Sequence, residues 1–101
     1  MADTEAVRLC AEAMGYLFDC DRDAAIIYVC PRNGPESRTR YDPITNGEQC
    51  LALVERFWLA CGNGDGKWYV RGDSNDEVED TNLRRAVVHC VAKAQAAKAA
   101  K

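Results

Sequence analysis

Apolar side chains recur at helical spacing in three parts of this chain. The first predicts a helix over residues 4–14, which Thr4 begins and Gly15 ends. Its apolar face consists of Val7, Cys10, Ala11 and Met14. The second predicts a helix from Thr45 to Cys61 whose apolar face carries Cys50, Leu51, Val54, Phe57, Trp58 and Cys61.

Polar residues at both ends of the second helix predict its limits. Thr45 and Glu48 form a capping box, in which each side chain bonds to the other residue's backbone N–H. Gly62 predicts a left-handed cap at the other end, before a tight turn at 63–66.

The third helix starts at Thr81, and we expect residues 96–101 to fray. Its apolar face contains Leu83, Ala86, Val87, Cys90, Val91 and Ala94.

Short runs between the helices predict β-strands. YLFDC at 16–20 and AAIIYVC at 24–30 predict a hairpin, and the second strand is central because it is apolar on both faces. KWYVR at 67–71 predicts a third strand. The polar segment 31–43 is either a long loop or a turn followed by an edge strand at 36–41, and both interpretations stay open.

These elements predict an α+β protein with the order α-β-β-α-β-α. At 101 residues the chain has room for a single domain, whose ordered core we expect over about 4–95. We predict a three-layer α-β-α sandwich, in which three helices cover a small antiparallel sheet of three or four strands.

Composition favours a globular protein of the cytoplasm. Apolar residues make up 48% and charged residues 29% of the chain. No apolar run approaches the roughly 20 residues that cross a bilayer, and MADTEAVR differs from a signal segment. We therefore predict no membrane association. The net charge of −3 includes an acidic stretch at 72–80 followed by a basic one at 81–101, which suits the dipole of the third helix.

Six cysteines raise the question of metal or catalytic chemistry. In a reducing cytosol we expect buried free thiols on the helices, with two more at strand ends: Cys10, Cys50, Cys61, Cys90, Cys20 and Cys30. His89 is the only histidine and no CxxC pair exists, so we predict no metal and no cofactor. His89 falls about 100° from Cys90 around the helix, which predicts a solvated histidine and no catalytic residue.

Two motifs resemble ligand loops only in part. Asp19, Asp21 and Asp23 match the first carboxylates of a calcium loop, but Ala24 replaces its glycine and Cys30 replaces its last glutamate. GNGDGK leads from a helix into a strand, whereas a phosphate-binding loop leads from a strand into a helix. We expect a solvated hairpin tip and an ordinary turn.

Two charged surfaces are candidates for binding. The first is acidic and suits a basic surface on a partner protein: Asp73, Asp76, Glu77, Glu79 and Asp80. The second has guanidinium groups and a phenol that suit an anion or a stacked base: Arg32, Arg38, Arg40, Tyr41 and Arg71. For both, the alternative interpretation is a solvated loop.

The segments TNGEQCLALVERFWLACGNGDGKWYV and DTNLRRAVVHCVAKA resemble small bacteriophage proteins with an α-β-α sandwich domain. Gly15-Tyr16, Trp68-Tyr69 and residues 82–86 occupy places typical of that family, and the resemblance covers most of 4–95. It implies the sandwich fold and a phage accessory protein, and it supplies no catalytic residues.

We therefore expect a non-enzymatic inhibitor that binds a host protein or protein complex in the host cytoplasm. An anti-defence factor such as a CRISPR-Cas inhibitor fits this expectation, with no direct binding of nucleic acid. The alternative is a sponge for a small anionic nucleotide signal, held by Arg32, Arg38, Arg40 and Arg71. An enzyme ranks third, because no convergent set of catalytic groups is evident among Asp21, Asp23, Glu79 and His89.

Overall fold

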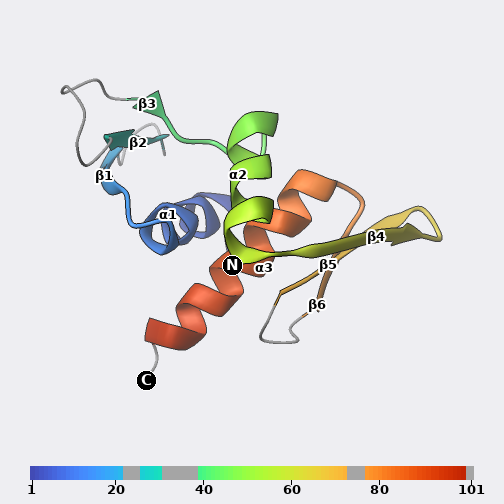
Figure 1. Ribbon diagram of the computed structural model, residues 1–101. Coiled ribbons are helices and arrows are strands. Elements are labelled where there is room, and N and C mark those ends of the chain that lie inside the picture. Colours follow the sequence, from blue (N-terminus) through green and yellow to red (C-terminus); the bar gives the residue numbers. More distant parts are fainter. Residues whose placement is uncertain (22–25, 31–38, 73–76, 100–101) are drawn as a thin grey trace.

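The computed structural model describes residues 1–21, 26–30, 39–72 and 77–99 (Figure 1). These residues form three helices and six strands. In chain order the elements are α1 (Asp3–Ala13), β1 (Leu17–Asp21), β2 (Ile26–Cys30), β3 (Thr39–Arg40), α2 (Gly47–Phe57), β4 (Ala60–Gly64), β5 (Lys67–Arg71), β6 (Glu77–Asp80) and α3 (Leu83–Ala99).

The strands form two antiparallel sheets, ordered β1-β2-β3 and β4-β5-β6. The first sheet and the second sheet lie on different sides of the helices (Figure 1). The α+β class, the three helices and the central position of β2 are confirmed. The prediction of one sheet is wrong, because β4 and β6 pair with β5 in a sheet of their own. The described residues do not show the predicted three-layer sandwich.

Helices α1 and α3 form the centre of the core, and they pack directly against each other. Their buried faces consist mostly of small side chains, which lets two helices approach closely. These residues are Ala6, Cys10 and Ala11 of α1 and Ala86, Val87, Val88 and Ala92 of α3. Leu53 of α2 and Val70 of β5 are also fully buried, and they attach the second helix and the second sheet to this pair.

The helix starts differ from the predicted ones by one or two residues. Asn46, rather than Thr45, caps α2, because its side-chain oxygen accepts a hydrogen bond from the Gln49 N–H at 3.1 Å. Asn82 accepts from the Arg85 N–H at 3.1 Å and caps α3 in the same way. Helix α3 then continues to Ala99, beyond the point where we expected fraying.

The end of α2 contradicts the predicted cap at Gly62. The helix ends at Phe57, and Trp58 takes the left-handed conformation with φ 52° and ψ 48°. The Leu59 N–H donates to the Val54 carbonyl at 3.1 Å, which is the longer hydrogen bond of a Schellman motif. The chain therefore leaves the helix before Cys61. Leu51, Trp58 and Cys61, which were predicted on the core face of this helix, are all exposed.

The strand predicted at 67–71 is confirmed as β5, and β6 is a strand where the sequence predicted a loop. Asp65 and Gly66 both have positive φ, as a two-residue hairpin turn requires, and they connect β4 to β5. Strand β6 lies in the acidic stretch and pairs with β5. In the first sheet, β3 pairs with β2, which matches the edge-strand interpretation for part of 36–41.

Candidate functional site

The outer face of the second sheet carries alternating side chains of β5 and β6. Side chains of a strand point to opposite faces in turn. Val70 points into the core and is fully buried, so Lys67, Tyr69 and Arg71 point to the other face. Tyr69 lies opposite Glu79 in the sheet. The Lys67 ammonium lies 3.5 Å from the Glu79 carboxylate, and both side chains are about half exposed. This face therefore presents a basic and aromatic row beside an acidic row.

Strand β4 forms the bare edge of this sheet. Its sequence is ACGNG, and all five residues are exposed. On the outer face, Gly62 lies opposite Tyr69 and Gly64 lies opposite Lys67. Because glycine has no side chain, no β4 side chain separates Tyr69 and Lys67 of β5 from solvent at this edge. In the described chain β4 pairs with β5 alone, which leaves its other side without a neighbouring strand.

Trp58 lies just before this edge and is 85% exposed. A left-handed conformation is unfavourable for a residue with a β-carbon, and helix ends usually place glycine there. The bulky indole is thus held in a strained backbone position and buries little of its own surface. Strain of this kind often marks a functional position. Trp58 was assigned to the core by its spacing, so the sequence missed it as a surface residue.

The predicted acidic surface is only partly available. Glu77 and Glu79 alternate along β6 on the outer face, while Asp73 and Asp76 lie outside the described residues. Asp80 serves the structure, since its carboxylate accepts from the Asn82 N–H at 2.9 Å and pairs with Arg85. The Asn82 N–H, followed by Arg85, lowers the pKa of Asp80. Asp80 is therefore committed to the start of α3.

The described members of the predicted arginine cluster do not come together. Arg40 belongs to the first sheet and lies 3.8 Å from the Asp42 carboxylate, whereas Arg71 belongs to the second sheet. Tyr41 is 4% exposed, and its ring meets Tyr16 edge to face at 5.7 Å between ring centres. It is therefore not available to stack on a base. Arg32 and Arg38 lie outside the described residues.

The Tyr41 side chain has an unusual environment. Its hydroxyl is buried and has no hydrogen-bond partner among the residues that the structure describes. Burial, with smaller contributions from nearby thiols and Tyr16, raises the pKa of Tyr41 far above its ordinary value. The phenol is therefore neutral at any physiological pH. An unpaired buried hydroxyl costs about 1–3 kcal/mol of stability.

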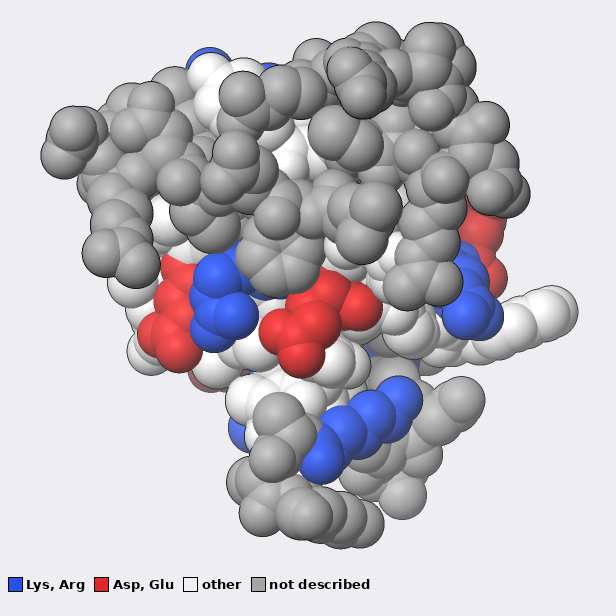
Figure 2. Space-filling view, turned by 90° about the vertical axis from the view of Figure 1, so that its left-hand side faces the viewer, with Lys and Arg blue, Asp and Glu red and all other residues white. Residues whose placement is uncertain are grey.

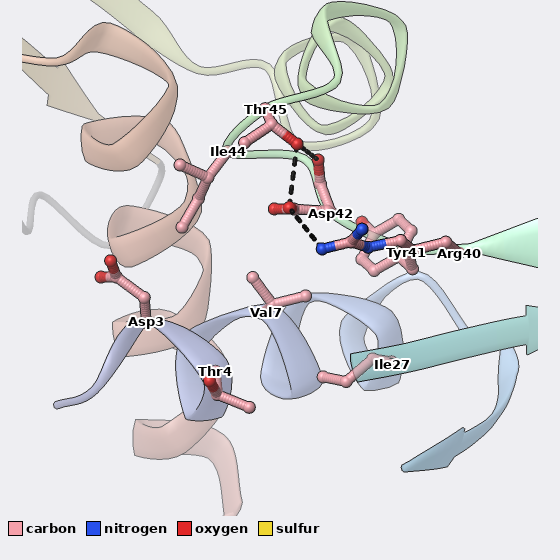
Figure 3. Close-up of a pocket in the computed structure, with 9 residues that line it drawn as sticks. All are labelled: Asp3, Thr4, Val7, Ile27, Arg40, Tyr41, Asp42, Ile44 and Thr45. Carbon is pink, nitrogen blue, oxygen red and sulfur yellow. Dashed lines mark hydrogen bonds and ion pairs between the residues drawn. The ribbon is translucent and has the colours of Figure 1, made fainter. Parts of the chain in front are cut away.

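A pocket of about 260 Å³ lies between α1, β2 and the segment that leads into α2 (Figure 3). Its charged groups already have partners, and those of Asp3 are His89 and Arg85. The Asp42 carboxylate accepts from the Thr45 hydroxyl at 2.8 Å and pairs with Arg40 (Figure 3). The other residues that line it are Asp3, Thr4, Val7, Ile27, Tyr41 and Ile44. A pocket this small, whose charged groups already have protein partners, gives little support for a nucleotide-sized ligand.

His89 is not solvated as the sequence predicted. Its side chain is 17% exposed, and Nε2 lies 2.7 Å from the Asp3 carboxylate. The same carboxylate accepts from the Arg85 guanidinium at 2.9 Å. Bonding to His89, followed by Arg85, lowers the pKa of Asp3. Asp3 of α1 thus binds Arg85 and His89 of α3. No local sequence pattern predicts a contact between residues so far apart in the chain.

The described thiols have ordinary core roles apart from one. Cys10, Cys50 and Cys90 are buried, as predicted, whereas Cys61 is exposed, and none of the four forms a disulfide within the described residues. The Cys10 thiol donates to the Val88 carbonyl at 3.2 Å, and burial raises the pKa of Cys10. A thiol in that state is a poor nucleophile. The side chains of Cys20 and Cys30 lie outside the described part of the chain.

Other features of the described residues leave the second sheet as the main candidate. No group of three or more histidine, cysteine or acidic side chains among them is placed to hold a metal ion. None of the described helices has the length and apolar character needed to span a bilayer. On the face shown in Figure 2, the visible acidic and basic side chains are interspersed and form no patch of one sign.

Comparisons of the chain with family models, curated proteins and solved structures found no match. The resemblance to small phage proteins therefore stays a prediction.

Proposed function

We propose that this protein is a small non-enzymatic inhibitor that binds a host protein or protein complex. In this proposal it belongs with the phage accessory proteins that have an α-β-α sandwich domain. It acts in the host cytoplasm as an anti-defence factor, such as a CRISPR-Cas inhibitor. The observation that carries the binding role is Trp58, which is 85% exposed, in a strained conformation, beside the exposed strand β4.

The residue types at this end of the second sheet suit protein recognition. Tryptophan, tyrosine and arginine supply most of the binding energy at protein interfaces. Trp58, Tyr69 and Arg71 provide all three on or beside the two strands of one hairpin. Such side chains contribute most when a partner removes them from water together. Glu77 and Glu79 extend the same face, so this part of the predicted acidic surface stays in the proposal.

The described ionisable groups favour binding over catalysis. Asp3, His89, Arg85 and Asp80 bond to one another across α1, α3 and β6. Each of these charged groups is therefore explained by a contact that stabilises the fold. The buried thiol of Cys10 is held protonated. A catalytic role requires a reactive group beside a cleft, whereas these four side chains bond to one another and the Cys10 thiol is buried.

The nucleotide sponge has less support. It requires several arginines around one ligand, but Arg40 and Arg71 lie in different sheets and Tyr41 is buried. Direct binding of nucleic acid usually requires a basic surface, and the side chains coloured on the face in Figure 2 form none.

Affinity capture tests the proposal. Immobilised protein is exposed to host lysate, and bound proteins are identified by mass spectrometry. We expect one host protein or complex to bind the parent protein and the control variant Leu51→Ala, and to be lost with Trp58→Ala. Leu51 is a suitable control because it is also an exposed apolar residue, at 56%, but lies in the middle of α2. Absence of any specific host protein, together with no protection of phage in a defence-proficient host, would refute the proposal.

A further inference from the structure

The two edges of the second sheet differ in how they are protected. Exposed edge strands invite pairing with other chains, and proteins usually block them with charges, proline or bulges. Strand β6 carries the acidic residues Glu77, Glu79 and Asp80. Strand β4 has neither a charge nor a proline, and every residue in it is exposed. The sheet is therefore closed to additional strands at β6 and open at β4.

The hairpin turn determines which backbone groups of β4 face outward. A two-residue turn closes on a hydrogen-bonded pair, here Gly64 and Lys67. Antiparallel pairs alternate between bonded and non-bonded. Gly62 and Ala60 then bond to β5, and the N–H and C=O groups of Cys61 and Asn63 point to the open side. No other strand of the described residues pairs with this side of β4, so these groups can bond to one more strand.

We propose that β4 is a docking edge for an extended acidic segment of a partner protein, which adds to the sheet as a fourth strand. This inference rests on the proposed function and specifies the chemistry of the partner. Addition of a strand to a sheet edge is a general mode of peptide recognition, in which backbone bonds give affinity and side chains give specificity.

Charge complementarity identifies the segment as acidic. Lys67 and Arg71 of β5 are exposed and are the basic residues of the outer face nearest to β4. Glu77 and Glu79 lie beyond them on β6, and the ion pair of Lys67 with Glu79, at 3.5 Å, is half exposed and therefore weak. An added strand lies about 9.6 Å from β5, two strand spacings away. On the outer face of β4, Gly64 lies opposite Lys67 and Gly62 lies opposite Tyr69, and only the methyl group of Ala60 lies opposite Arg71. Long basic side chains of β5 and carboxylates of the added strand therefore reach each other across β4.

The spacing of the basic residues sets a sequence pattern for the partner. Lys67 and Arg71 are four residues apart on one face, or about 13.6 Å along the strand. Acidic residues at positions i and i+4 of the added strand match this separation. Between them, position i+2 lies beside Gly62 and Tyr69, where an aromatic side chain has room to pack. A second copy of this chain is a poorer occupant, since pairing β4 with β4 supplies no acid for either basic residue.

Two synthetic peptides test the charge pattern with the intact protein. TEVYVET places glutamates at i and i+4, and TKVYVKT is the matched basic control. Binding of fluorescently labelled peptide is followed by anisotropy. We expect TEVYVET to bind and TKVYVKT not to bind, and Arg71→Glu to weaken TEVYVET by about fivefold, as for loss of one exposed ion pair. Equal binding of the two peptides, or no binding of TEVYVET, would overturn the inference.

A second pair of measurements tests strand addition itself. Asn63→Pro removes an outward N–H from the edge, where proline is tolerated, and we expect at least a tenfold loss of TEVYVET binding. Peptides with N-methyl groups on one or the other alternate set of amides give the same test without changing the protein: only one set should abolish binding. Equal binding of both methylated peptides would exclude an added strand.

Two outcomes separate this inference from the proposed function. Capture of the same host protein by the parent and by Asn63→Pro would leave the inhibitor proposal intact and refute docking at β4. A dimer of the parent protein in analytical ultracentrifugation that becomes a monomer with Asn63→Pro would show that a second copy occupies the edge, and this also overturns the proposal of an acidic partner.

Discussion

His89 and Asp3 bind each other across the interface between α3 and α1, with 2.7 Å between Nε2 and the carboxylate oxygen. Arg85, one turn earlier on α3, donates to the same carboxylate at 2.9 Å and also pairs with Asp80 at the end of β6. One acidic side chain in the first turn of α1 therefore receives two donors from α3. Through Arg85, this contact also reaches the second sheet.

We expect Asp3→Asn to reduce the free energy of unfolding by up to about 1 kcal/mol, because exposed ion pairs contribute little individually. Asp3 is about half exposed, which keeps the loss small. Urea denaturation measures the change. Glu5→Gln is the matched control, since Glu5 is an exposed acid in the same turn. An equal loss for both variants would contradict a specific role for Asp3.

The same contacts predict how stability depends on pH. Asp3 and Asp80 both have lowered pKa values in the folded protein. Groups of this kind add stability above their unfolded pKa of about 3.9, and the contribution is lost as the pH falls through the folded value. We expect the double variant Asp3→Asn with Asp80→Asn to lose less stability than the parent between about pH 4 and pH 2. Parallel curves for the two proteins, from urea midpoints, would contradict this.

The start of α2 gives a prediction that separates two capping residues. Asn46→Ala should reduce stability by about 1 kcal/mol, because it removes the acceptor for the Gln49 N–H. Thr45→Ala should cost less, since its hydroxyl makes an exposed hydrogen bond to the Asp42 side chain outside the helix. Thermal or urea unfolding compares the two. A larger loss at Thr45 would support the capping box that the sequence suggested.

The elements that the sequence predicted correctly are those in which the regularly spaced apolar residues are the residues that the fold buries. The α1 stripe of Val7, Cys10 and Ala11 is buried, and so is the central part of the α3 stripe. The first hairpin also lies where alternation and the polar turn placed it. In these segments local propensity and tertiary packing favour the same structure.

Strand β4 could not be predicted from the same pattern. The spacing of Phe57, Trp58 and Cys61 continues a helical stripe, and the first glycine follows at 62. The helix ends at Phe57, and the left-handed cap position four residues before Gly62 is taken by Trp58, in a conformation usually found for glycine. Strand β6 has Val78 as its only apolar residue, so pairing with β5 decides its structure.

The candidate site was missed for a related reason. Tyr69 and Arg71 were visible in the sequence, but their neighbours in space depend on where β4 begins. Tyr41 and Arg71 were grouped by chemistry, and packing separated them into the core and the second sheet. Contacts between distant residues, such as Asp3 with His89, leave no local pattern.

Cys61 should react faster than the other described thiols. It is exposed on β4, whereas Cys10, Cys50 and Cys90 are buried. Burial raises the pKa of Cys10, Cys50 and Cys61 alike, so the exposure of Cys61 is what distinguishes it. Brief alkylation of the native protein, followed by peptide mapping, should find Cys61 modified before these three. The Cys61→Ser variant provides the control, and early modification of Cys10 would contradict the packing of α1 against α3.

Trp58→Gly should raise the free energy of unfolding by about 0.5–1 kcal/mol, although it removes a large side chain. Trp58 is 85% exposed, so little buried surface is lost, and glycine relieves the strain of the left-handed conformation. Glu55→Gly is the matched control within α2, where glycine should destabilise the protein by about 1 kcal/mol. Urea denaturation measures both changes, and affinity capture measures binding. If the strain is kept for recognition, Trp58→Gly yields a more stable protein that no longer binds its partner; a destabilised variant would show instead that the indole contributes to folding.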